Sequence, residues 1–129
     1  MNTVEGIAAI LRTPMPGGEV MIGTPNPELF TAGMPITRDE ERVGEVHSMW
    51  LDEDRVRWLG VLDAPEPGIR GIPVRDLVEA RRLVGVPALT ADTVGREGGV
   101  QVLDQWTATS MTLLDPRSAP WADLELHLR

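Results

Sequence analysis

Two histidines, His47 and His127, are the side chains of this sequence best suited to act as a general base. A serine hydrolase would use one of them to activate a hydroxyl, and Ser48, Ser110 and Ser118 are the candidate nucleophiles. However, the sequence contains no Gly-x-Ser-x-Gly or similar nucleophile turn. The pattern therefore favours histidines that are ordinary residues on the surface or edge of a strand.

Acidic and glycine-rich clusters do not have the spacing of metal or phosphate sites. The turn Asp52–Asp54 and the run Arg38–Arg42 lack the pattern of a calcium loop, and the two histidines are not four residues apart. Cysteine is absent, which excludes thiolate ligands. The pairs Gly17–Gly18 and Gly98–Gly99 are not followed by a helix with Lys-Ser/Thr. We therefore predict neither a metal nor a cofactor.

Length and charge limit the class of protein. A chain of 129 residues predicts a single domain over residues 1–129. The net charge of −8 argues against nucleic acid as a partner, because phosphate binding needs a basic face. No apolar run approaches the ~20 residues of a membrane span, so no membrane association is expected. All twelve basic residues are arginine, which slightly favours protein–protein contact.

The elements that must position any site are mostly strands. Alternating apolar residues, with Pro and Gly as breaks, predict strands over Thr3–Arg12, Glu19–Ile22, Glu45–Asp52, Arg55–Asp63, Val86–Val94, Val100–Trp106, Thr107–Leu114 and Trp121–Leu128. We predict one principal helix that begins at Pro73 and stops at Gly85, and a single helical turn over Pro27–Ala32. The fold class is mainly β with one principal helix (α+β), as a small β-barrel or folded sheet.

Four tryptophans carry most of the aromatic surface. Core packing is their simplest explanation, and an anchor facing a partner is the alternative. Trp50 and Trp58 lie on opposite arms of the predicted hairpin and could pair across its strands. The candidate interface comprises this pair, Arg117 and Trp121 in the segment Arg117–Trp121, and the Pro-rich loop Ala64–Pro73.

The order of several segments is distinctive: EGIAAIL near the N-terminus, PELF, MPITRDEERVGEV, EDRVRWLGVL, the helical VRDLVEARRLVG before VPALTADT, and WTATSMTLLDPRSAP. This order resembles the prohead (capsid maturation) protease family of tailed phages over nearly the whole chain. The resemblance implies the barrel fold of the prohead and herpesvirus proteases, with a serine nucleophile, a histidine base and a third residue near the last motif.

The departures fall on the catalytic positions. The family's histidine corresponds to Arg38, its serine to Thr90, and its third residue to the stretch Thr107–Thr109, with Thr109 as the degenerate position. An arginine stays protonated at neutral pH and cannot act as a base. A threonine without a base is a poor nucleophile. The resemblance therefore implies a fold that has lost its active site.

The resemblance further implies a fold that once recognised capsid protein and that retains a surface suited to the shell. We therefore expect a non-catalytic virion protein that is assembled in the host cytoplasm, binds the major capsid protein as a decoration or stabilising component, and forms a homo-oligomer. Two alternatives remain: a working serine protease that uses His47 with Ser110 on a shifted register, and an unrelated small β-barrel interaction module.

Overall fold

The computed structural model describes residues 3–15, 18, 20–31, 33–63, 68–69, 72–121 and 124–129. These residues form eleven strands, one α-helix and one 3-10 turn. The first six strands are β1 (Thr3–Ile10), β2 (Val20–Ile22), β3 (Pro25–Phe30), β4 (Pro35–Arg38), β5 (Glu41–Asp52) and β6 (Arg55–Leu62). They are followed by β7 (Gly68–Ile69), β8 (Ile72–Pro73), α1 (Val74–Glu79), β9 (Val84–Glu97), β10 (Val100–Leu114), η1 (Pro116–Ser118) and β11 (Glu125–Leu128).

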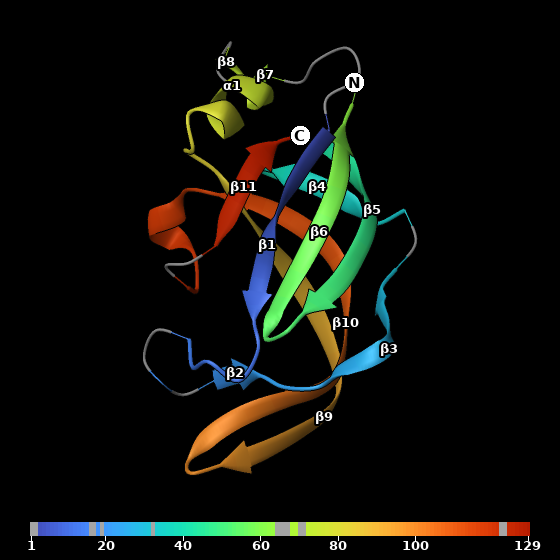
Figure 1. The fold of residues 1–129 in the computed structure, drawn as a ribbon, viewed down its shortest axis with the longest axis vertical. Helices are drawn as coiled ribbons and strands as arrows, with labels where there is room; N and C mark the ends of the chain where they lie inside the picture. The colour runs from blue at the N-terminus through green and yellow to red at the C-terminus, as the bar shows by residue number, and fades with distance from the viewer. Residues whose placement is uncertain are drawn as a thin grey trace.

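Nine strands form one folded sheet, in the order β11-β1-β6-β5-β4-β10-β2. Strands β3 and β9 also pair with β10, so β10 is the centre of one half of the sheet. The sheet folds round until β9 lies against β1 (Figure 1). Because the two halves face each other, their inner side chains form the core. The predicted class is confirmed in coarse terms: the described chain is mainly β with one short helix.

The β5–β6 hairpin is present, as the alternation of its second arm predicted. Its strands pair antiparallel through the turn between Asp52 and Arg55. The expected pairing of its two tryptophans is wrong, because Trp50 faces Arg57 across the ladder and Trp58 faces Met49. Trp50 and Trp58 therefore belong to different cross-strand pairs. The side chain of Trp50 is exposed, whereas that of Trp58 is fully buried.

Four predicted elements differ from the structure. The helix α1 ends at Glu79 because Arg81 has a positive φ of 56°, and the segment from Val84 onward is already strand. The predicted helical turn at Pro27 is the extended strand β3. The strand Glu19–Ile22, expected to pair back on Thr3–Arg12 across the intervening turn, forms its ladder with β10 instead. Two backbone bonds still join the two segments, from Arg12 N–H to Ile22 and from Met15 N–H to Val20, each at 2.8 Å. The two strands predicted over 100–114 are one strand that bends at Gln105, where φ is 51°.

The core is organised around Trp58, which has no exposed surface. Three glycines on three strands surround its indole: Gly6 on β1, Gly60 on β6 and Gly85 on β9. A Cβ atom added at Gly85 would lie 2.6 Å from Cζ2 of the indole and 3.0 Å from Sδ of Met111. These positions therefore exclude larger side chains because the indole occupies the space. This packing holds β9 against the opposite side of the sheet.

Candidate functional site

Only one of the four tryptophans is substantially exposed. Trp50, near the end of β5, is 37% exposed, and its neighbour Leu51 is 44% exposed. Trp58 and Trp106 are fully buried, and Trp121 is 6% exposed. Trp58 and Trp121 are buried in the core, so Trp50 is the one candidate interface tryptophan that presents exposed surface. Core packing explains three tryptophans, and the alternative of a partner-facing anchor survives for Trp50.

Two of the buried indoles are fixed by hydrogen bonds to backbone carbonyls. Nε1 of Trp106 donates to the oxygen of Gly23 at 2.9 Å, and Nε1 of Trp121 donates to the oxygen of Thr13 at 3.0 Å. Each bond joins strand and loop segments that are distant in sequence. These tryptophans hold the N-terminal loops against the C-terminal half of the chain, which is a structural role.

Arg117 lies on the surface, as expected for an interface residue, and its side chain is 90% exposed. It is bound within its own turn, since its Nε and Nη2 both donate to the carboxylate of Asp115, each at 3.1 Å. The backbone N–H of Arg117 also donates to that carboxylate at 2.9 Å. These bonds lower the pKa of Asp115 from 3.8 to about 2. A partner that used this guanidinium would have to compete with Asp115.

The three positions that correspond to the family's catalytic residues do not converge. Arg38, at the end of β4, donates from Nη1 to the carbonyl of Leu113 at 3.2 Å. Thr90 is exposed on β9 and pairs with Thr107, which lies six residues before Leu113 on β10. Six residues of extended chain span about 20 Å. Thr109 lies nearer to Thr90, but its hydroxyl donates to the carbonyl of Ala88 at 3.3 Å.

The shifted pair His47 and Ser110 is also not brought together. His47 is on β5 and Ser110 is on β10, and strand β4 lies between these two strands. Two strand spacings correspond to about 10 Å, which is beyond hydrogen-bond reach. His47 is exposed and places Nε2 3.3 Å from the carboxylate of Glu45. His127, on β11, faces Glu5 across the ladder with β1.

Two further observations concern the described part of the chain. Within it, no three His, Asp or Glu side chains lie close enough to hold a metal ion together. No helix there has both the length and the apolar character that crossing a bilayer requires. Most of the Ala64–Pro73 loop, a third interface candidate, lies outside the described residues.

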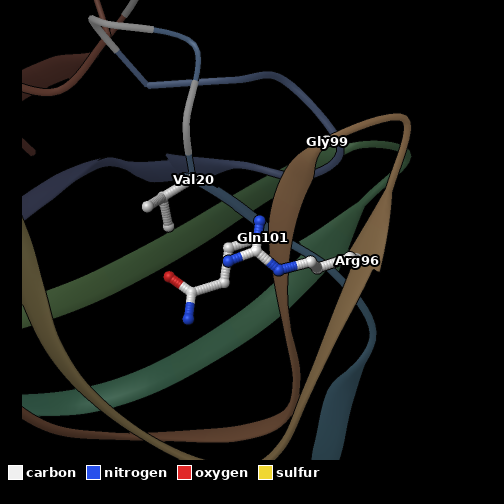
Figure 2. Close-up of a pocket in the computed structure, with 4 residues that line it drawn as sticks. All are labelled: Val20, Arg96, Gly99 and Gln101. Atoms are coloured by element: carbon white, nitrogen blue, oxygen red, sulfur yellow. The ribbon is translucent and has the colours of Figure 1, made fainter.

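Two surface pockets are lined by residues of β2, β9 and β10. A pocket of about 220 Å³ is lined by Met15, Ile22, Val86, Pro87, Leu89, Leu103, Pro120 and Trp121. A second pocket, of about 340 Å³, is lined by Val20, Arg96, Gly99 and Gln101 (Figure 2). The first is apolar, and the second is polar with a single charged group, Arg96. Neither pocket is lined by a His, Asp or Glu side chain that could act as a general acid or base.

The sequence-based interpretation missed two exposed apolar residues, Leu51 and Val94, which are 44% and 54% exposed. Both flank tight turns, the one at 53–54 and the one at 98–99. Side chains near the end of a hairpin extend past the core, so distance from the nearest turn was the signal that could have found them.

Comparison with known proteins finds no family model, no curated protein and no solved structure that matches this chain.

Proposed function

We propose that this chain is a non-catalytic structural protein of a tailed-phage virion, which binds the capsid shell as a decoration or stabilising protein on a protease-like fold. The phage setting follows from the order of segments that resembles the prohead proteases. The binding role rests on one observation above all: Trp50 is exposed on an ordered hairpin, whereas Trp58, Trp106 and Trp121 are buried.

The surroundings of Trp50 suit a binding anchor. Its cross-strand neighbour is Arg57, whose Nε donates to the carboxylate of Asp52 at 2.6 Å. Because this ion pair crosses the hairpin near its turn, the backbone that carries Trp50 is held in one conformation before binding. Pre-ordered tryptophan and arginine side chains are typical of the residues that dominate binding energy.

The side chains at the end of the β5–β6 hairpin indicate what kind of partner surface would be complementary to it. Trp50 and Leu51 provide apolar area, and the adjacent exposed residues Asp52, Glu53 and Asp54 carry negative charge. A complementary surface on the shell is an apolar pocket with a rim of basic side chains. We name the stretch from Trp50 to Asp54 the acidic tip.

The first test is the copy number of the chain in purified mature particles of the phage that encodes it. Trypsin cleaves this sequence only after arginine, and it releases the peptide Leu83–Arg96, which contains neither Met nor Trp. Quantification of this peptide against the major capsid protein is expected to give a ratio near one or a simple fraction of it. Absence from mature particles would contradict the proposal.

The second test locates the binding surface. Purified chain is added to shells that lack it, and the bound fraction is measured after sedimentation. Trp50→Ala is expected to weaken binding by about tenfold or more, because a buried tryptophan anchor contributes ~2 kcal/mol or more. The control is Glu79→Ala, which shortens an exposed side chain on α1, outside the acidic tip and every other candidate interface segment. Equal binding by both variants would show that the acidic tip is not the contact.

A further inference from the structure

The outer part of β9 has an open edge. Among the described residues this strand forms a ladder only with β10, whereas β10 is paired on both sides. Figure 1 shows the β9–β10 hairpin extending to the end of the molecule opposite α1. Over Asp92–Arg96 every residue except Gly95 is exposed. An open edge of this kind presents unpaired backbone groups to another strand.

The amides of Asp92, Val94 and Arg96 point to the open side. The loop of the hairpin is Gly98–Gly99, with φ values of 56° and 83°, which is the two-residue turn that closes on a hydrogen-bonded pair. The pair that closes it is Glu97 with Val100, so alternate residues of β9 counted back from Glu97 face β10. The residues between them face outward.

Hydrogen bonds on the far side of β10 agree with this assignment. The carbonyl of Leu103 accepts from Gly23, and the N–H of Gln105 donates to Thr24, both at the edge of β10 away from β9. The residues of β10 that remain for β9 are therefore the intervening ones, such as Val102, whose partner is Gly95. Val94 and its alternate neighbours are left to face the open side.

The side chains of the same three residues form a self-complementary row. Asp92, Val94 and Arg96 lie on one face of β9 because side chains alternate along a strand. Val94 is 54% exposed between the two opposite charges. Neither charge has an ion-pair partner in the described chain. Figure 2 shows Arg96 lying beside Gln101, a neutral side chain.

We propose that this edge binds a second copy of the chain, with the two β9 strands paired antiparallel about a two-fold axis at Val94. In this register Val94 faces Val94 of the second copy, and Asp92 faces Arg96 on both sides of the axis. A two-fold axis requires one residue to face its own copy, so few registers exist. An axis at Asp92 or Arg96 would oppose like charges, and an axis at Thr93 or Gly95 would pair each charge with a neutral residue or leave it unpaired.

Charge reversal tests the register. The dissociation constant of the full chain is measured by analytical ultracentrifugation at several concentrations and at low salt. Asp92→Arg and Arg96→Asp each place two like-charged pairs across the axis, and each is expected to weaken self-association by about tenfold or more. The double variant, Asp92→Arg with Arg96→Asp, restores opposite charges and is expected to return the dissociation constant to within about threefold of the original.

Two controls make the same changes in net charge elsewhere. Glu79 and Arg75 are exposed residues on α1, and the substitutions Glu79→Arg and Arg75→Asp are expected to leave self-association unchanged. Circular dichroism of each variant confirms that it is folded. A chain that stays monomeric up to about millimolar concentration overturns the proposal. A dimer that the single reversals do not weaken, or that the double variant does not restore, overturns the proposed register and with it the proposal.

Discussion

The packing of Trp58 predicts that alanine substitutions at two glycines of β9, Gly85 and Gly95, have very different effects on the stability of the fold. A methyl group at Gly85 would lie 2.6 Å from the indole, about 1 Å closer than normal carbon–carbon contact. The indole has no free space to move into, because Gly6 and Gly60 lie against it on two other strands. At Gly95 nothing lies within 4 Å of the added carbon. Gly85→Ala should therefore destabilise the fold, and Gly95→Ala should not.

The expected sizes follow from known costs. Overpacking of this kind costs about 2 kcal/mol, a large part of the ~5–15 kcal/mol by which domains are stable. Gly95→Ala should stabilise by about 0.5 kcal/mol, because alanine restricts the unfolded chain and favours strand over glycine. For a chain of this size the free energy of unfolding falls by about 2 kcal/mol per M urea, so Gly85→Ala should lower the urea midpoint by about 1 M.

The assay is equilibrium urea unfolding followed by circular dichroism, in dilute protein. A third variant tests the cause: in a Trp58→Phe background the smaller ring removes the atom that clashes, so the additional cost of Gly85→Ala should fall below about 1 kcal/mol. Equal midpoints for Gly85→Ala and Gly95→Ala would refute the packing argument. An unchanged cost in the Trp58→Phe background would show that the clash is not with the indole.

Two further predictions concern single hydrogen-bonded contacts, and a third tests for a reactive serine. The hydrogen bonds from Arg117 lower the folded pKa of Asp115 from 3.8 to about 2, so its contribution to stability is complete above pH 3.8 and is lost as the pH falls towards 2; a carboxyl NMR titration should show the midpoint, and Arg117→Ala should raise it. Trp106→Phe leaves the buried carbonyl of Gly23 without its donor and should cost about 1–3 kcal/mol in urea unfolding, in addition to the lost packing. A fluorophosphonate should not label the intact protein in mass spectrometry; labelling that is lost on Ser110→Ala would instead support a hydrolase.

The hairpin that carries the candidate site could be predicted from the sequence, but which of its tryptophans is exposed could not. The sequence placed Trp50 and Trp58 on neighbouring strands of a hairpin, which is correct, because alternation over Arg55–Leu62 is a local signal. It did not show which of the two faces the core. Trp58 is buried because β9, a strand distant in sequence, closes over it at Gly85.

The prediction of the helix failed for a similar reason. The apolar spacing from Val74 onward continued past the observed end at Glu79, and residues such as Leu83 and Val84 fitted a helical face. In the structure these two residues are buried in the core, with Val84 opposite Leu114 on β10. A long strand pairing outweighed the helical pattern, since apolar spacing alone does not specify what the apolar face meets.

The sequence alone determined the alternation of strands, the turn of the β5–β6 hairpin, the acidic charge and the absence of a nucleophile motif, because each depends on residues close to one another in the chain. Only the tertiary structure decided which tryptophan reaches solvent, that Arg38 and Thr90 lie far apart along the sheet, and that β9 keeps an open edge. Those properties depend on which strands distant in the sequence lie beside one another, and no local pattern specifies that arrangement.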